Sequence, residues 1–121
     1  MPIDYRIDKQ RGVVWSRATG VVTDADLLQH QERLRRDPDF QPHFRQLFDF
    51  TSGTVNAVTG RAIRQLAAAP AFGKGSKRAL LVHADSAFGL ARMFQTLRDE
   101  QEDEVAVFRD EAAARAWLGV E

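Results

Sequence analysis

The stretch Arg78-Ala79-Leu80-Leu81-Val82-His83 determines the fold that we expect. A strand with one solvated face alternates apolar and polar residues, whereas this stretch is apolar at four consecutive positions. Such a run is typical of a strand that is buried on both faces, as in a parallel sheet with helices on each side. The sequence therefore predicts an inner strand over residues 78–83.

A helical pattern is expected on each side of this strand. The preceding helix ends before Pro70 and begins at one of two alternative caps, Thr54 or Thr59. Its apolar stripe is Val55, Val58, Ala62, Ile63, Leu66 and Ala69. Ser86 is the expected cap of the following helix, with Leu90, Met93, Phe94 and Leu97 as its core stripe.

Two further strands flank these helices. Gln46–Phe50 is a short apolar strand, and the hydroxyl-rich residues 51–54 predict the turn that follows it. Val105–Phe108 is the last strand, after which Asp110 caps a last helix. The alternation of strand and helix implies parallel pairing through right-handed crossovers.

The first 36 residues add a hairpin and a helix. Ile3–Asp8 and Val13–Val22 read as two strands joined at Arg11-Gly12. Thr23-Asp24-Ala25-Asp26 is a capping box, and the helix that it starts ends before Pro38. We therefore expect one α/β domain over residues 1–121, with a mixed five-stranded sheet, an N-terminal hairpin and about four helices.

Composition excludes several classes of function. The chain has 121 residues, 44% of them hydrophobic, no cysteine, and 17 acidic residues balanced by 17 basic ones. Disulfides and thiolate metal sites are excluded, and zero net charge without a basic, aromatic-rich patch argues against nucleic-acid binding. No apolar run approaches the ~20 residues that span a bilayer, and no secretory signal pattern is present, so we expect a cytoplasmic protein.

Histidine spacing does not predict a metal site. His30, His43 and His83 fall on a helix, a loop and a strand end, without the short spacing of metal ligands. We expect His30 and His43 at the surface, and neither a metal nor a cofactor.

Charge is unevenly distributed along the chain. Residues 51–84 hold no acid and five bases, which are Arg61, Arg64, Lys74, Lys77 and Arg78. A helix that begins after Asp49 would offer free N–H groups to an anion at the carboxyl end of a parallel strand. The predicted ligand-binding residues are Asp49, Thr51, Ser52, Thr54, Thr59, Arg61, Arg64 and His83. The alternative is that these bases form a solvated helix face that balances the acidic last third of the chain.

The order of elements, together with a closing Val-Phe-x-Asp-x-x-x-Ala-x-x-Trp-Leu pattern, resembles the SpoIIAA-like family. That pattern is Val107-Phe108-Arg109-Asp110 followed by Ala114, Trp117 and Leu118. This family of small bacterial proteins is related to the STAS domain of anti-sigma-factor antagonists and to the SEC14/CRAL-TRIO lipid-binding fold. The resemblance implies a binding or regulatory domain rather than an enzyme.

The phosphorylated antagonists of that superfamily carry Asp-Ser-Ser-Gly, and the corresponding stretch here is Ala57-Val58-Thr59-Gly60. The glycine and one hydroxyl are kept, whereas the aspartate and the first serine are not. The resemblance thus implies Thr59 as a candidate phosphoacceptor, with Ser52 as a second hydroxyl in the same region.

Three functions follow, in order of preference. The first is a non-enzymatic domain that holds a small anionic, apolar or lipid-like ligand, or a regulatory protein, near residues 49–64. The second is a phosphorylation-responsive signalling domain, and the third is a small hydrolase using Asp49, Ser52 and His83, although the Gly-x-Ser-x-Gly elbow is absent.

Trp15 and Phe88 are the predicted interface residues, and a two-fold homodimer is expected.

Overall fold

The computed structural model describes residues 2–120 and has the predicted order of elements, ββαβαβαβα. The elements are β1 (Ile3–Asp8), β2 (Val13–Thr23), α1 (Asp24–Arg36), β3 (Arg45–Ala57), α2 (Gly60–Ala68), β4 (Lys77–Leu81), α3 (Asp85–Leu97), β5 (Glu104–Phe108) and α4 (Glu111–Leu118). The predicted α/β class is confirmed.

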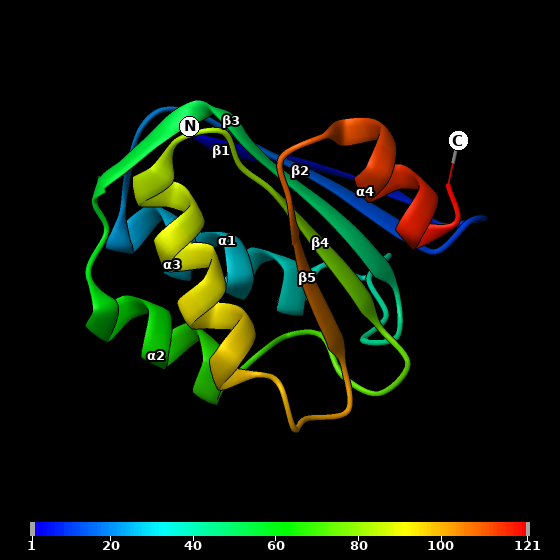
Figure 1. Ribbon diagram of the computed structural model, residues 1–121. Helices are drawn as coiled ribbons and strands as arrows, with labels where there is room; N and C mark the ends of the chain where they lie inside the picture. Colours follow the sequence, from blue (N-terminus) through cyan, green and yellow to red (C-terminus); the bar gives the residue numbers. More distant parts are fainter. Residues whose placement is uncertain (1, 121) are drawn as a thin grey trace.

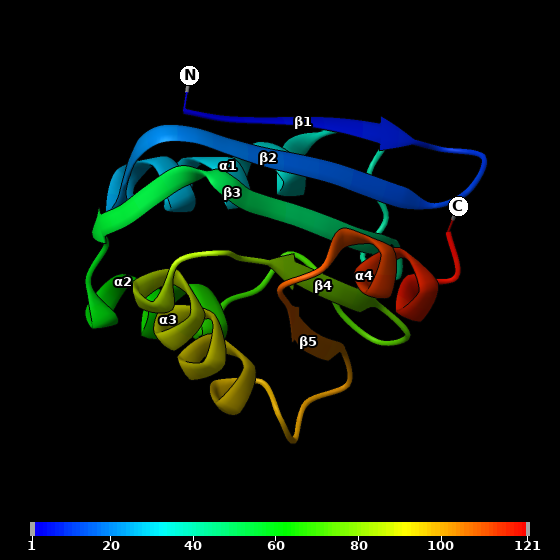
Figure 2. The same cartoon turned by 45° about the horizontal axis from the view of Figure 1, so that its top comes forward.

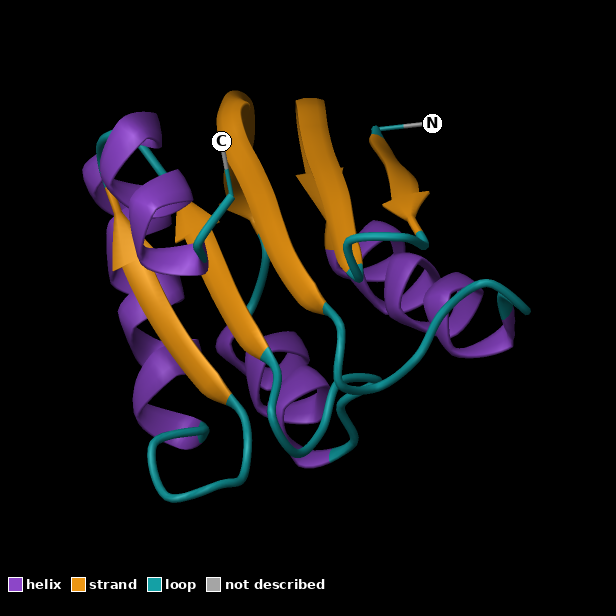
Figure 3. Ribbon diagram, turned by 90° about the vertical axis from the view of Figure 1, so that its right-hand side faces the viewer, coloured by secondary structure: helices purple, strands orange, loops and turns teal. Residues whose placement is uncertain are grey.

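One mixed sheet forms the middle layer. Its strand order is β1-β2-β3-β4-β5, in which β1 and β2 form the predicted antiparallel hairpin and all other neighbours are parallel. Helices α1, α2 and α3 cover one face, and α4 packs on the other (Figures 1 and 2). In Figure 3 the five strands lie side by side, with the N-terminal strand at one edge.

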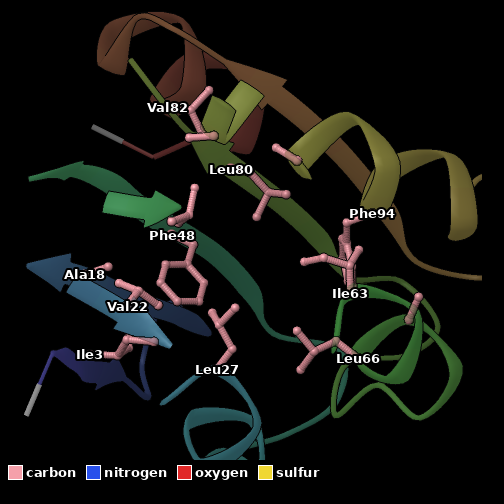
Figure 4. Packing of buried hydrophobic residues seen from close by; sticks show 14 residues of the cluster. Ile3, Ala18, Val22, Leu27, Phe48, Ile63, Leu66, Leu80, Val82 and Phe94 are labelled. Atoms are coloured by element: carbon pink, nitrogen blue, oxygen red, sulfur yellow. The ribbon is translucent and has the colours of Figure 1, made fainter. Parts of the chain in front are cut away.

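The core lies on both sides of β4, as its apolar run predicted. Leu80 belongs to the main cluster beneath α1–α3 (Figure 4), whereas Ala79 faces Ala114 and Leu118 of α4. Both strand residues are buried. The inner strand is therefore covered on each face, which is the condition under which consecutive apolar residues are favourable.

Side chains cap three of the helices where local sequence indicated a start. The Thr23 hydroxyl accepts a hydrogen bond from the Asp26 backbone N–H (3.2 Å), and the Asp26 carboxylate accepts one from the Thr23 N–H (2.9 Å). The Asp110 carboxylate caps α4 by accepting a hydrogen bond from the Ala113 N–H (3.0 Å). Of the two alternatives for α2, Thr59 is the N-cap.

The third strand is longer than predicted. β3 continues to Ala57, so residues 51–54 form strand instead of a turn, and Val55 and Val58 precede α2 rather than belonging to it. The cause is long-range pairing, because Ser52 and Thr54 lie in register with the last residues of β2. A strand partner outweighs the local turn preference of hydroxyl residues.

The third helix also differs from the prediction. α3 begins at Asp85 with Ala84 as N-cap and no side-chain cap, so Ser86 does not start it. Its buried residues are Ala87, Ala91 and Phe94, whereas Leu90 and Met93 are half-buried and Leu97 is 41% exposed. The face of α3 that is turned to the core is therefore built on the two alanines and Phe94, while the other large apolar residues lie at its flanks.

Candidate functional site

The predicted anion-binding residues of β3 do not lie at a helix N-terminus. Asp49 is within the strand, where its carboxylate accepts hydrogen bonds from the backbone N–H (2.8 Å) and the hydroxyl (2.6 Å) of Thr51. The exposed Ser52 accepts a hydrogen bond from Arg17 at 3.4 Å. Because Thr51, Ser52 and Thr54 belong to a strand, they cannot add hydrogen bonds at the start of α2.

The predicted residues of α2 lie at its outer surface. The Thr59 hydroxyl donates to the Asp24 carboxylate (2.7 Å) and accepts a hydrogen bond from the Ala62 N–H (3.2 Å). Arg61 and Arg64 are exposed, and neither forms an ion pair within residues 2–120. The buried face of α2 is the opposite one, and the binding role of the two arginines stays a prediction.

The hydrolase alternative lacks its geometry. His83 is exposed just beyond β4, and its carbonyl oxygen accepts a hydrogen bond from Arg109 at 3.0 Å. Across the described part of the chain, Asp49, Ser52 and His83 form no hydrogen bond with one another. A nucleophile, a base and an orienting acid need such contacts to act together.

A cavity of about 80 Å³ lies between the sheet and helices α1–α3. Side chains from β3, β4 and all three helices line it. Figure 4 shows Phe48 and Leu27 on one side of this region and Ile63 and Leu66 on the other. The wall is mostly apolar, as in sites that hold small molecules with a carbon body.

The stretch from residue 49 to 64 borders this cavity through its apolar side chains. Phe50, Val55, Val58 and Ile63 line the cavity, whereas none of the eight predicted binding residues does. The polar residues of the lining are His30, Gln31 and Arg78. The cavity thus lies beside the predicted segment 49–64, but the polar groups that line it are not the predicted binding residues.

Arg78 is the charged residue of the cavity lining. Its side chain is buried, and its guanidinium carbon lies 4.4 Å from the ring centre of Phe72 and 5.0 Å from that of Phe94. Nε donates to Gln46 Oε1 at 3.2 Å. Burial lowers the pKa of Arg78 to about 10, so the group remains a cation at neutral pH. The flanking rings stabilise that charge through their π faces.

The charge of Arg78 is incompletely matched. Its Nη1 lies 3.8 Å from Asp103 Oδ2, and within residues 2–120 neither atom has a hydrogen-bond partner. Asp103 instead accepts hydrogen bonds from Nε and Nη2 of Arg98, whose Nη1 donates to the Ala67 carbonyl. Two buried guanidinium groups therefore share one buried carboxylate, which leaves one positive charge in excess.

A chain of buried hydrogen bonds extends from Arg78 beneath the sheet. Gln46 Nε2 donates to the Ser16 hydroxyl at 3.1 Å, and that hydroxyl lies 2.9 Å from His30 Nε2. Arg78 of β4, Gln46 of β3 and Ser16 of β2 thus form a continuous hydrogen-bonded path from the cavity wall to α1. Buried polar groups persist in a core when they are paired in this way.

His30 is a buried residue, and its predicted surface position is wrong. It lies three residues after Leu27 and four before Leu34, which is the spacing of one helical face. Its ring centre is 4.8 Å from that of Phe48. Burial, reinforced by the charges of Arg78 and Arg33, lowers the pKa of His30 to about 3, so its ring is neutral at physiological pH.

The two predicted interface aromatics contact arginines of this chain. Trp15 is half-buried, with the guanidinium carbons of Arg6 and Arg115 at 5.7 and 4.8 Å from its ring centre. Phe88 is half-buried against the main core cluster and lies 4.5 Å from the Arg109 guanidinium carbon. Their contact with a partner stays a prediction.

Comparison with known proteins identifies the architecture. No protein-family model and no curated protein matched the sequence. Within residues 2–120, no helix has the length and apolarity needed to cross a membrane. A solved structure from Shewanella loihica PV-4, described as an uncharacterised DUF3478-family protein with a SpoIIAA-like fold, matches with a TM-score of 0.60. The identity is 18%, and the match covers 96% of this chain and 93% of the other. The expected architecture is therefore confirmed: this chain has a SpoIIAA-like fold.

Proposed function

We propose that this protein is a non-enzymatic binding domain whose small ligand occupies the cavity between the sheet and α1–α3. The observation that carries the proposal is an apolar cavity lined in part by Arg78, a buried cation that shares its one buried carboxylate, Asp103, with Arg98. Small-molecule sites combine an apolar wall with a few polar groups that fix orientation. The cavity has both features.

Three helices meet at this cavity, which gives binding a route to regulation. Helices α1, α2 and α3 each contribute lining residues, so a molecule in the cavity contacts all three at once. A ligand that binds the folded state stabilises the packing of these helices by mass action. We infer that binding changes the surface offered to a regulatory partner through these helices.

Neutral isobutyramide, followed by protein NMR titration, tests the binding proposal. The amide signals of lining residues in β4 and α3 should shift in a saturable manner, while those of α4 stay unchanged. Ala91→Leu fills the cavity from α3 and should abolish the shifts, whereas Ala113→Leu, at an exposed site on α4, should retain them. Equal binding by both variants, or shifts confined to the outer surface, would contradict the proposal.

A phosphorylation-responsive domain is the second candidate, and one contact favours it. Thr59 is exposed at the N-cap of α2, and its hydroxyl is hydrogen-bonded to Asp24 of α1. A phosphate there would replace a hydrogen bond by repulsion between two anions. Phosphorylation would therefore loosen α1 from α2, which are two walls of the cavity.

A further inference from the structure

We propose that the ligand of the cavity is a small monocarboxylate, whose carboxylate is held by Arg78 and whose short carbon body fills the apolar space. This inference rests on the proposed function and specifies the chemical class of the ligand.

The buried charges of the core do not balance. Within residues 2–120, the buried charged side chains are Arg78, Arg98 and Asp103. The sum of these charges is +1, because His30 is neutral. An uncompensated charge in a low-dielectric interior is costly, and a ligand with a single negative charge would balance it.

The unmatched positive charge lies at the wall of the cavity. Arg78 lines the cavity, and its guanidinium lies 5.0 Å from the ring of Phe94, another lining residue. Nη1 is buried toward Asp103, 3.8 Å from Oδ2, whereas Nη2 donates no hydrogen bond within residues 2–120 and is the donor left for a ligand. A planar guanidinium binds carboxylates through charge-assisted hydrogen bonds.

The space beside Arg78 is small and apolar. A cavity of about 80 Å³ is roughly half the ~150 Å³ that admits benzene in an apolar protein interior. It therefore suits a body of about three carbon atoms beside the carboxylate, as in isobutyrate. The rest of the lining is largely aliphatic and aromatic, so it offers little to a dianion or a sugar.

Isobutyrate and isobutyramide form the matched pair of probes, because they differ in charge and hardly in shape. Calorimetric or NMR titration of the unaltered protein should show isobutyrate binding roughly 10- to 100-fold more tightly, as for a hydrogen bond to a charged group. This comparison needs no variant. Equal affinities would overturn the carboxylate assignment and leave the binding function intact, whereas failure of both probes would contradict the binding function itself.

Arg78→Gln should remove the preference for isobutyrate while isobutyramide still binds. Arg36→Gln, at an exposed position of α1, is the control and should leave both affinities unchanged. If Arg64→Gln instead abolishes the preference, the anion binds at the surface of α2 and the proposal is wrong. Competition by sodium chloride at equal concentration would show that the site takes any monoanion, which would also overturn the carboxylate specificity.

Discussion

The carboxylate of Asp24, at the start of α1, accepts two hydrogen bonds from Thr59, the N-cap of α2. The Thr59 backbone N–H lies 2.8 Å from Oδ1 and its hydroxyl 2.7 Å from Oδ2. Two helix starts that are 35 residues apart in the sequence are thereby tied together. The same hydroxyl also caps α2, so one side chain serves both contacts.

Thr59→Ala is expected to lower the free energy of unfolding by about 1–2 kcal/mol, because it removes the cap and the link to Asp24. Asp24→Ala removes the link alone and should cost less. Urea denaturation of both variants and of the double variant measures the coupling between the residues. Strictly additive losses would show that the link contributes nothing beyond the cap.

Thr59→Glu, an imitation of phosphorylation, should destabilise the protein more than Thr59→Ala does. The added carboxylate would face Asp24, and like charges at this distance repel. Asp24→Asn in the same chain should recover part of the loss. A Thr59→Glu variant as stable as the parent protein in urea would argue against a switch at this position.

Asp103→Asn should cost about 3–5 kcal/mol, because it leaves Arg78 and Arg98 buried without an anion. Asp99 lies four residues earlier in the acid-rich run 99–104 but is exposed, so Asp99→Asn is the matched control and should change stability by less than about 0.5 kcal/mol. The midpoints of urea unfolding measure both. Similar midpoints for the two variants would mean that the buried cluster does not stabilise the fold.

His30 predicts a specific dependence of stability on pH. Its pKa is lowered to about 3 in the folded protein, so between that value and about 6.5 the unfolded chain binds a proton that the folded protein does not. Stability conferred by the neutral ring is therefore complete above pH 6.5 and declines by about 1.4 kcal/mol per pH unit as the medium is acidified.

His30→Gln should remove this part of the acid sensitivity, since glutamine does not titrate. Denaturant unfolding at a series of pH values from 7 to about 4 gives the slope of stability against pH for the variant and for the parent protein. His43→Gln is the control, because that residue is exposed, and it should follow the parent protein. Identical slopes for His30→Gln and the parent would exclude the buried ring as a source of acid sensitivity.

Two glycine substitutions should change stability in opposite directions. A Cβ at Gly53 of β3 would lie 3.2 Å from Ala18 Cβ and 3.3 Å from the Ala18 carbonyl carbon, so Gly53→Ala should cost about 1–3 kcal/mol. Gly89 lies within α3 with open space around it, and Gly89→Ala should stabilise by about 0.5–1 kcal/mol. Thermal unfolding measures the stability of both variants. If Gly53→Ala is as stable as the parent protein, β2 and β3 can move apart at this point.

The sequence alone determined the elements whose signals are local. The capping box at Thr23, the cap at Asp110 and the hairpin around Gly12 depend on neighbours within a few residues, and each is present in the structure. The inner strand was predictable as well, because four consecutive apolar residues are favourable only when both faces are covered. These patterns sufficed for the order of elements and the fold class.

Tertiary structure alone decided the length of β3 and the composition of the site. Ser52 becomes part of a strand only because β2 runs beside it. In the sequence Arg78 was one of five bases in the acid-free segment 51–84 and no pattern singled out Asp103, yet both are buried beside Arg98. Local sequence cannot encode these positions, because the free energy of a buried charge depends on partners that only the folded chain brings within reach.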